Sequence, residues 1–250
     1  MRALAIALAV ASLAAAPKPN TPEWADDADV VEHLGSKLPL DLPFRDSTGA
    51  RVTLRDYFDG TQPVYLILAY YECPQLCSLV LDAANRAMAQ LHRWGFDGYR
   101  ALTISFDATE GTDQAARKKQ MMGAGWPFLV GDAASIEALT QRLGFHFLRD
   151  AKTGAIAHAA VTFVIAPDGT ISRYLYGIDM PPRDLRLALL ESSDGKTGSI
   201  GDKILLRCFH YDAATHRYGL FVARFMQVGG ALIFVVAVIV IASFARRRRR

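Results

Sequence analysis

The sequence predicts an α/β domain in which helices cover both faces of a mixed sheet. Segments rich in β-branched and aromatic residues alternate with segments whose apolar residues recur at helical spacing. The run VYLILAYY, residues 64–71, is apolar throughout, as expected of a strand buried on both faces. The pattern closes on a hairpin whose turn is Pro167-Asp168-Gly169, which adds an antiparallel pair to the sheet.

The first predicted elements are a hairpin, a strand and a helix. LPLDLPFRDSTGARVTL alternates in polarity and turns at residues 46–49. The strand at 64–71 follows. LCSLVLDAANRAMAQLHRWG then places apolar residues at helical spacing, and Gly95 is a typical helix end.

The strand and helix pattern then repeats along the chain. Proline at the start of the last helix suits the first turn, where a missing N–H costs nothing. We expect, in order, a strand in 99–108, a helix in 112–122, a short strand in 126–132, a helix in 134–144, a hairpin in 159–177 and a helix in 181–193.

Composition and charge limit the function classes. The chain has 250 residues, 51% hydrophobic and 21% charged, enough to bury one good-sized core. The formal net charge is +3, but Arg2 and the run 246–250 supply six of the 28 basic residues. The remaining 22 face 25 acidic residues, so no basic surface is left for nucleic acid.

The N-terminus is predicted to be a targeting segment rather than part of the fold. Residues 1–16 combine one early arginine, a short apolar run and the small residues Ala14 and Ala16, as in a signal peptide. Residues 17–36, which contain Pro and Asp, are expected to be a linker. The folded domain is then expected at 37–195.

The C-terminus is predicted to anchor the chain in a membrane. A connector, 196–224, precedes residues 225–245, which carry no charge and are long enough to span ~30 Å of hydrocarbon. A buried core helix is the alternative. The basic tail 246–250 favours the cytoplasmic side. We therefore expect a bacterial inner-membrane protein with one C-terminal span and its domain in the periplasm.

Two of the three cysteines lie in the motif Cys73-Pro74-Gln75-Leu76-Cys77. Cys73 falls where the buried strand ends, and Cys77 lies one turn into the next helix on the same face. A helix N-terminus lowers the pKa of a thiol. Two such sulfurs suit Cu(I) or thiol–disulfide exchange. A structural disulfide is the alternative, but it would close only a single turn.

The motif follows a buried strand, and His158 precedes the closing hairpin in the segment AHAAVTFVIAPDGTISRYLYG. In these two features the sequence resembles the Sco (SenC, PrrC) family. The resemblance runs from about Leu38 to Ser193. It implies a thioredoxin-like mixed sheet flanked by helices. It also implies copper ligation by Cys73, Cys77 and His158, the thiolates holding Cu(I) and the imidazole completing a site for Cu(II).

Two positions near the motif need separate comment. The family usually has Asp-Pro where this chain has Asp107-Ala108, which leaves the role of Asp107 open. Glu72 precedes the first cysteine, and its charge would raise a thiolate pKa if it pointed inward. We expect Glu72 to face solvent.

The resemblance implies a role in cytochrome c oxidase assembly, with oxidase subunit II as partner. The chain would deliver copper to the binuclear site of subunit II or keep its cysteines reduced. A periplasmic copper donor or a thioredoxin-like reductant would be further partners. The alternative is a thiol–disulfide oxidoreductase or redox sensor with Cys73 and Cys77 as the redox-active pair. C-x-x-x-C spacing and the missing cis-proline before Val161 favour a metallochaperone over an enzyme.

The third cysteine lies in the connector. GDKILLRCFHYDAATHRYGLF contains Cys208 and His210, whose spacing can present one sulfur and one nitrogen to a metal. A buried thiol, an accessory copper site and a disulfide partner are the alternatives. The histidines without a motif are expected at the surface: His33, His92, His146 and His216.

Overall fold

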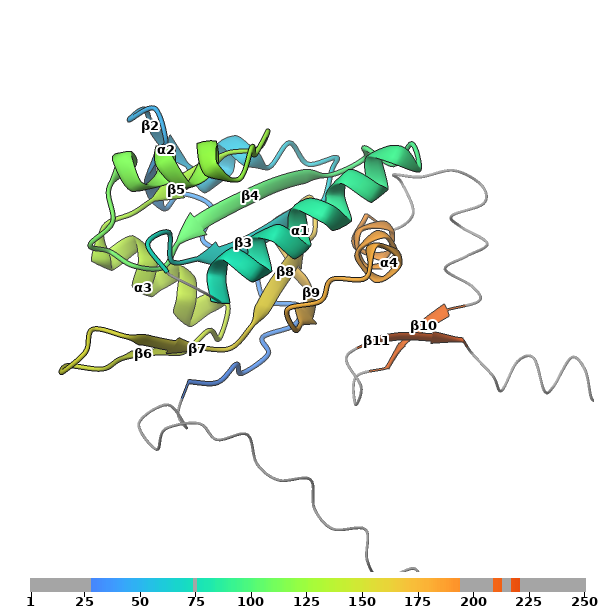
Figure 1. Cartoon of the computed structure of the whole chain (residues 1–250). Coiled ribbons are helices and arrows are strands. Elements are labelled where there is room, and N and C mark those ends of the chain that lie inside the picture. The colour runs from blue at the N-terminus through green and yellow to red at the C-terminus, as the bar shows by residue number, and fades with distance from the viewer. Residues whose placement is uncertain (1–27, 74–75, 194–208, 213–216, 221–250) are drawn as a thin grey trace, which may run out of the picture.

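The computed structural model describes residues 28–73, 76–193, 209–212 and 217–220 (Figure 1). Its main element is a seven-stranded sheet in the order β2-β1-β5-β4-β3-β8-β9. The strands of this sheet are β1 (Pro43–Asp46), β2 (Arg51–Thr53), β3 (Val64–Ala69), β4 (Arg100–Ser105), β5 (Phe128–Val130), β8 (Val161–Ile165) and β9 (Ile171–Tyr176). The helices are η2 (Leu54–Tyr57), α1 (Leu76–Arg93), α2 (Thr112–Met121), α3 (Ala133–Arg142) and α4 (Pro182–Ser192).

Strand β3 is the centre of the fold, and its burial confirms the prediction from the uninterrupted apolar run. All six residues are buried. Tyr65, Ile67 and Ala69 belong to the core on the side of α1 and α4, while the residues between them belong to the second core, which includes α3. This alternation is the period of two that a pleated strand imposes.

The pairing of β3 decides which segments meet at the edge of the sheet. β3 is parallel to β4 and antiparallel to β8, with Ile67 opposite Thr162. The carboxyl ends of β3 and β4 therefore lie at the same edge as the start of β8. Residues that follow β3, follow β4 or precede β8 are brought together there.

The helix ends show why two glycines are needed. Gly95 ends α1 with φ +69°, as predicted. Gly144 follows α3 with φ +60°, and a Cβ there would lie 1.8 Å from the carbonyl oxygen of Val31. The N–H of Val31 donates to the carbonyl of Gly144 at 2.9 Å. Residues 28–36, which the sequence assigns to the linker, are thus hydrogen-bonded to the domain.

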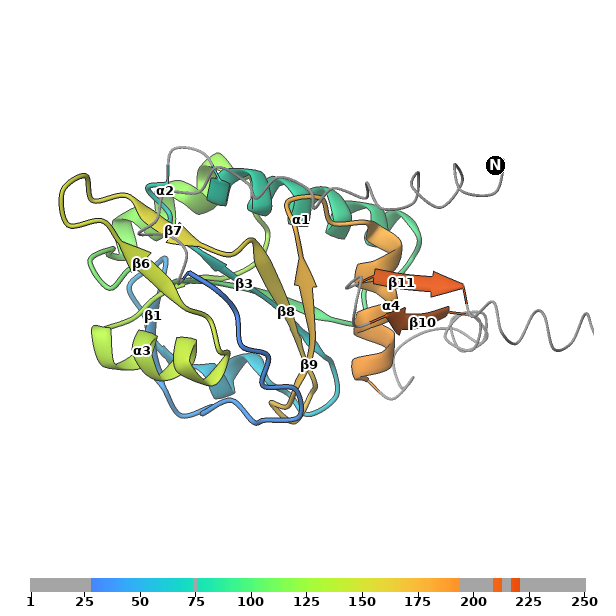
Figure 2. The same ribbon diagram turned by 90° about the horizontal axis from the view of Figure 1, so that it is seen from below.

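Two short hairpins were not predicted. β6 (Phe147–Arg149) and β7 (Ile156–His158) form a two-stranded ladder outside the main sheet. Figure 2 shows it at the end of the sheet where α1 begins. β10 (Phe209–Asp212) and β11 (Arg217–Leu220) form the second ladder, inside the predicted connector.

No helix within the described ranges has both the length and the apolarity of a bilayer span. The predicted span at 225–245, the signal peptide at 1–16 and the tail at 246–250 lie outside those ranges. They stay predictions.

Candidate metal centre

The cysteine motif lies at the junction of β3 and α1, as predicted. Cys73 is half-buried in the turn after β3, and its N–H donates to the carbonyl of Tyr70 at 3.2 Å. Its side chain packs against the core cluster that contains Phe106. Cys77 lies in the first turn of α1, although its side chain is outside the described part of the structure.

Glu72 faces solvent, which confirms the sequence expectation. Its side chain is 55% exposed and Arg117 lies 3.4 Å away. The charge of Glu72 is therefore screened by water and by a guanidinium. It does not enter the apolar surroundings of Cys73.

Glu110 is a buried carboxylate behind the cysteine turn that no sequence pattern singles out. It is only 6% exposed. Its oxygens accept from the backbone N–H of Tyr71 at 3.0 Å, the N–H of Glu72 at 2.8 Å and the hydroxyl of Ser105 at 2.5 Å. Burial outweighs these bonds and raises the pKa of Glu110.

His158 is the last residue of β7, directly opposite Phe147 of β6. Its ring lies 5.0 Å from that of Phe106 and 5.9 Å from that of Phe145, measured between centroids. Nδ1 lies 2.9 Å from the carbonyl oxygen of Ala159. Burial lowers the pKa of His158. A neutral imidazole that donates from Nδ1 has Nε2 as its ligating atom.

The register of the sheet places the two halves of the site at one edge. Beyond the pair Ile67–Thr162, the chain of β3 runs toward Cys73 while the chain before β8 runs back toward His158. Phe106, which follows β4, contacts the ring of His158 and belongs to the cluster against which Cys73 packs. Cys73 and the ring that contacts His158 therefore belong to the same core cluster at this edge.

The donors that can be described suit a soft or borderline metal. Cys73 offers a sulfur that packs against apolar residues, and His158 offers an imidazole whose pKa is lowered by burial. Among the described residues no group of three or more His, Cys, Asp or Glu is arranged to hold a metal. The third proposed ligand, the Cys77 side chain, lies outside that search. The set Cys73, Cys77 and His158 thus stays a prediction.

Asp107 has a structural role that the sequence left open. It is 4% exposed and its Oδ2 lies 2.5 Å from a terminal nitrogen of Arg149, in β6. Oδ1 accepts from the N–H of Thr109 at 3.0 Å and from its hydroxyl at 2.7 Å. Burial would raise the pKa of Asp107, but these bonds and the guanidinium outweigh it, so the pKa is lowered.

A hollow of about 340 Å³ opens beside Cys73, between the start of α1 and α2. It gives a partner molecule a route to the cysteine. Its lining residues are Tyr71, Glu72, Cys73, Ser78, Gln114, Arg117, Lys118 and Met121.

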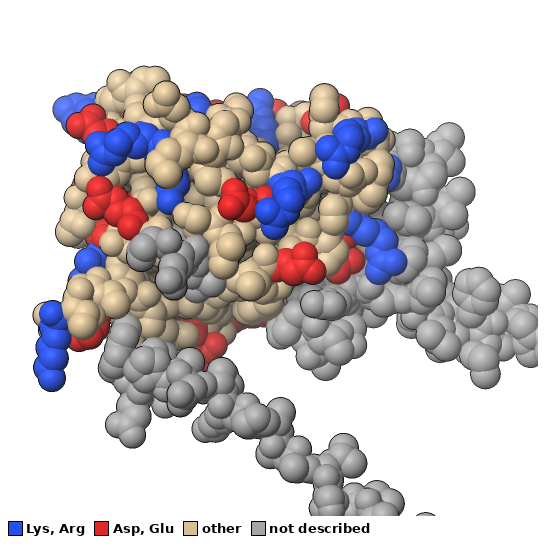
Figure 3. Space-filling model, in the orientation of Figure 1, with Lys and Arg blue, Asp and Glu red and all other residues tan. Residues whose placement is uncertain are grey.

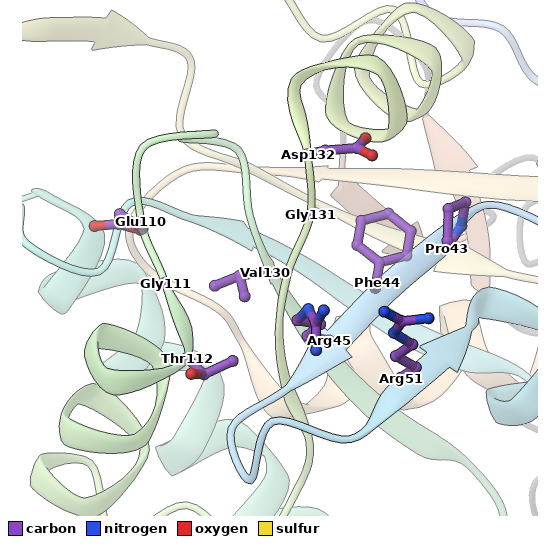
Figure 4. Close-up of a pocket in the computed structure, with 10 residues that line it drawn as sticks. All are labelled: Pro43, Phe44, Arg45, Arg51, Glu110, Gly111, Thr112, Val130, Gly131 and Asp132. Atoms are coloured by element: carbon purple, nitrogen blue, oxygen red, sulfur yellow. The ribbon is translucent and has the colours of Figure 1, made fainter.

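A larger hollow, of about 540 Å³, lies elsewhere and contains none of the predicted site residues. It is bounded by β1, β2 and the starts of α2 and α3, and Arg45 and Arg51 stand side by side in it (Figure 4). The carboxylate of Glu110 points away from this hollow, toward the cysteine turn. The face in Figure 3 carries both signs of charge interspersed, without a basic stripe.

The remaining predicted residues are Cys208, His210 and the four histidines without a motif. His210 lies in β10 opposite Gly219, whereas Cys208 and His216 fall outside the described residues, so the accessory site stays a prediction. His92 and His146 are exposed, as expected. His33 is half-buried instead, with Nδ1 3.1 Å from the carbonyl oxygen of Arg142, because residues 28–36 pack on the domain.

Three comparisons place this geometry among known proteins. The family model described as SCO1/SenC matches residues 37–188. A search of curated protein sequences gives no significant match. The solved structures do give matches, and the three described next have sequence identities of 15% to 22%.

One similar structure is an Aquifex aeolicus VF5 protein assigned provisionally to electron transfer, with 22% identity and a TM-score of 0.59 over 64% of this chain and 95% of that one. Another is Arabidopsis thaliana ScoI with copper bound, with 15% identity and a TM-score of 0.53 over 64% and 97%. A third is BsSco, described as a member of the Sco family of cytochrome c oxidase assembly proteins, with 15% identity and a TM-score of 0.54 over 66% and 98%. These likenesses confirm the thioredoxin-like mixed α/β fold.

Proposed function

The chain belongs to the SCO1/SenC family, and on that premise we propose that it binds copper and assists cytochrome c oxidase assembly. Its partner is subunit II of the oxidase, to whose binuclear site it delivers copper or whose cysteines it reduces. The ligands are Cys73, Cys77 and His158. One observation carries the proposal: a half-buried imidazole, whose pKa is lowered by burial, lies at the sheet edge where the C-P-x-x-C turn leaves β3.

The chemistry of the donors supports copper in two oxidation states. Two thiolates favour the soft Cu(I) ion, and the added nitrogen accommodates Cu(II). Cys77 lies in the first turn of α1, and the positive end of a helix favours the thiolate form of a cysteine. Among the structural relatives, Arabidopsis ScoI has copper bound.

Thiol–disulfide exchange is the second candidate function. A disulfide switch has been identified in BsSco, one of the structural relatives. In the present chain the hollow at Cys73 supports the same chemistry, because an incoming thiolate needs access to one sulfur of the pair. Copper binding and thiol reduction use the same two cysteines, so both proposals predict loss of function on replacing either.

The location follows from the two ends of the chain. We propose that the domain lies in the periplasm of a bacterium, held in the inner membrane by residues 225–245 with the tail 246–250 inside. An alkaline phosphatase fused to the C-terminus should then be inactive. An active fusion would reverse the orientation.

The direct test is an anaerobic titration of the reduced full chain with Cu(I) against a competing chelator. The native chain should bind tightly, and Cys73→Ser and Cys77→Ser should each lose that binding. Met121→Ala is the matched control, because Met121 lines the same hollow but is 79% exposed and is no proposed ligand. Full Cu(I) affinity in either serine variant would refute the site.

A further inference from the structure

Residues 105–110, from the last residue of β4 onward, carry three buried polar side chains. Ser105 is fully buried, Asp107 is 4% exposed and Glu110 is 6% exposed. A buried carboxylate is costly unless it is hydrogen-bonded or paired. The two carboxylates have partners in different parts of the fold. The partners of Glu110 lie next to Cys73, and the partner of Asp107 lies in the hairpin that carries His158.

Glu110 contacts the cysteine half. One carboxylate oxygen accepts from the N–H of Tyr71 and the other from the N–H of Glu72, two successive groups just before Cys73. A second tie lies alongside, because the N–H of Phe106 donates to the carbonyl of Ala69 at 3.1 Å. The path of the chain into Cys73 is therefore set from the β4–α2 segment.

Asp107 contacts the histidine half. Its partner Arg149 is the last residue of β6, and β6 pairs along its whole length with β7, which ends at His158. The ladder lies outside the main sheet, so its position depends on such side-chain contacts. Arg149 is 41% exposed, and water weakens the pair accordingly.

Ser105 joins the two contacts. Its hydroxyl donates to Glu110 at 2.5 Å and accepts from the N–H of Asp107 at 3.1 Å. The three residues thus form one connected polar network within six positions of the chain.

We propose that residues 105–110 act as a bracket that positions the two halves of the metal centre separately. Glu110 sets the cysteine turn, and Asp107 sets the histidine hairpin through Arg149. Both carboxylates are positioning residues and not ligands, since their oxygens are engaged by the hydrogen bonds described. The inference rests on the proposed copper site.

The test compares Glu110→Gln with Arg149→Met in the full chain. Glutamine has nearly the same shape but offers an NH₂ group to a backbone N–H. Glu110→Gln should weaken Cu(I) binding by about tenfold, the loss expected for one hydrogen bond to a charged group. Arg149→Met should alter the EPR spectrum of bound Cu(II) and leave Cu(I) affinity within about twofold, because the thiolates are untouched.

Two metal-free readouts separate this proposal from the proposed function. Glu110→Gln should change the rate at which iodoacetamide alkylates Cys73, followed by peptide mass spectrometry, without affecting the hairpin. Arg149→Met should speed amide hydrogen exchange in 147–158 several-fold and leave Cys73 alkylation unchanged. Glu137→Gln and Arg142→Met, both at exposed α3 residues, are the matched controls.

The outcomes decide between the alternatives. The bracket is supported if each variant changes only its own half in the metal-free readouts. It is supported further if Glu110→Gln weakens Cu(I) binding while Arg149→Met alters only the Cu(II) spectrum. Equal effects of both variants on both halves, or none, overturn it. If Glu110→Gln does not fold, Ser105→Ala replaces it and should change both halves modestly. A native chain that binds no copper refutes the proposed function, and the metal-free readouts then decide the bracket alone.

Discussion

The two halves of the candidate metal centre, the turn at Cys73 and the β6–β7 hairpin with His158, differ in how far the elements that carry them are buried. The cysteine turn continues β3, all of whose residues are buried between two cores. The histidine lies on a ladder of two three-residue strands outside the main sheet, with the residues of its tip, 151–155, exposed. A two-stranded ladder is marginal by itself. It is held here by the rings of Phe106 and Phe145, which contact Phe147 and His158, and by the Asp107–Arg149 pair.

This difference separates what the protein needs in order to fold from what the proposed Cu(II) site needs. The proposed sulfur ligands follow β3, the strand buried between the two cores. The proposed nitrogen ligand lies on a ladder outside the main sheet. A change in the hairpin should therefore alter the metal site at little cost in stability, while a change near β3 should alter both.

The first prediction concerns ligand loss in each half. Cys73→Ser should lower Cu(I) affinity by more than the roughly 10–100-fold typical of an outer partner of a metal ligand. His158→Ala should lower it by less than about tenfold but abolish the Cu(II) spectrum of the native chain. Chelator competition and EPR measure the two effects. Equal losses of Cu(I) affinity would show that the halves are not distinct.

The second prediction concerns stability. Ile67→Ala in β3 should lower the free energy of unfolding by about 3 kcal/mol, because Ile67 is fully buried. Ile156→Ala in β7 should cost about 1 kcal/mol, because its side chain is half-buried. Urea denaturation followed by circular dichroism gives both values. A cost for Ile156→Ala as large as for Ile67→Ala would mean that the hairpin is part of the core.

The third prediction uses the opposite pKa shifts of the two carboxylates. The pKa of Asp107 is lowered, so its contribution to stability is full above the unfolded value of about 3.9 and is lost as pH falls through the folded pKa. The pKa of Glu110 is raised, so its contribution is full at low pH and is lost as pH rises through the folded pKa.

Substitution of each carboxylate should show this contrast. Asp107→Asn should destabilise the domain by about 1–2 kcal/mol at pH 7 and by less as the pH falls below about 4. The cost of Glu110→Gln should instead decrease as the pH rises. Urea midpoints between about pH 3 and pH 7 measure both trends, and parallel trends in the two variants would contradict the assignment.

The fourth prediction is the smallest effect and concerns Cys208, outside the described residues. Cys208→Ser should leave the Cu(I) affinity of the Cys73/Cys77 site within about twofold, since Cys208 is not among the ligands proposed for that site. If an accessory site exists with His210, the full chain should bind a second copper that this variant loses. Unchanged stoichiometry would support a buried thiol.

Much of the fold could be predicted from local patterns. The apolar run of β3, the helical spacing of α1 and the turn at Pro167-Asp168-Gly169 each carry their own signal. The β6–β7 ladder carries none, because its strands are three residues long and do not alternate in burial.

The supporting residues of the site could not be predicted for a related reason. Glu110 and the N–H of Tyr71 are 39 positions apart, and Asp107 and Arg149 are 42 apart. Such pairs arise from the register of β3, β4 and β8, which no local pattern fixes. The candidate ligands could be predicted because the two cysteines and Pro74 form a local motif, and because the family resemblance pointed to His158.

The most direct test of the copper site is X-ray absorption spectroscopy of the full chain loaded with one Cu(II). We expect two sulfur scatterers and one imidazole nitrogen in the first coordination shell. Cys73→Ser and Cys77→Ser should each remove one sulfur, and His158→Ala should remove the imidazole. A spectrum fitted by nitrogen and oxygen alone, or one unchanged by these substitutions, would contradict the proposed site.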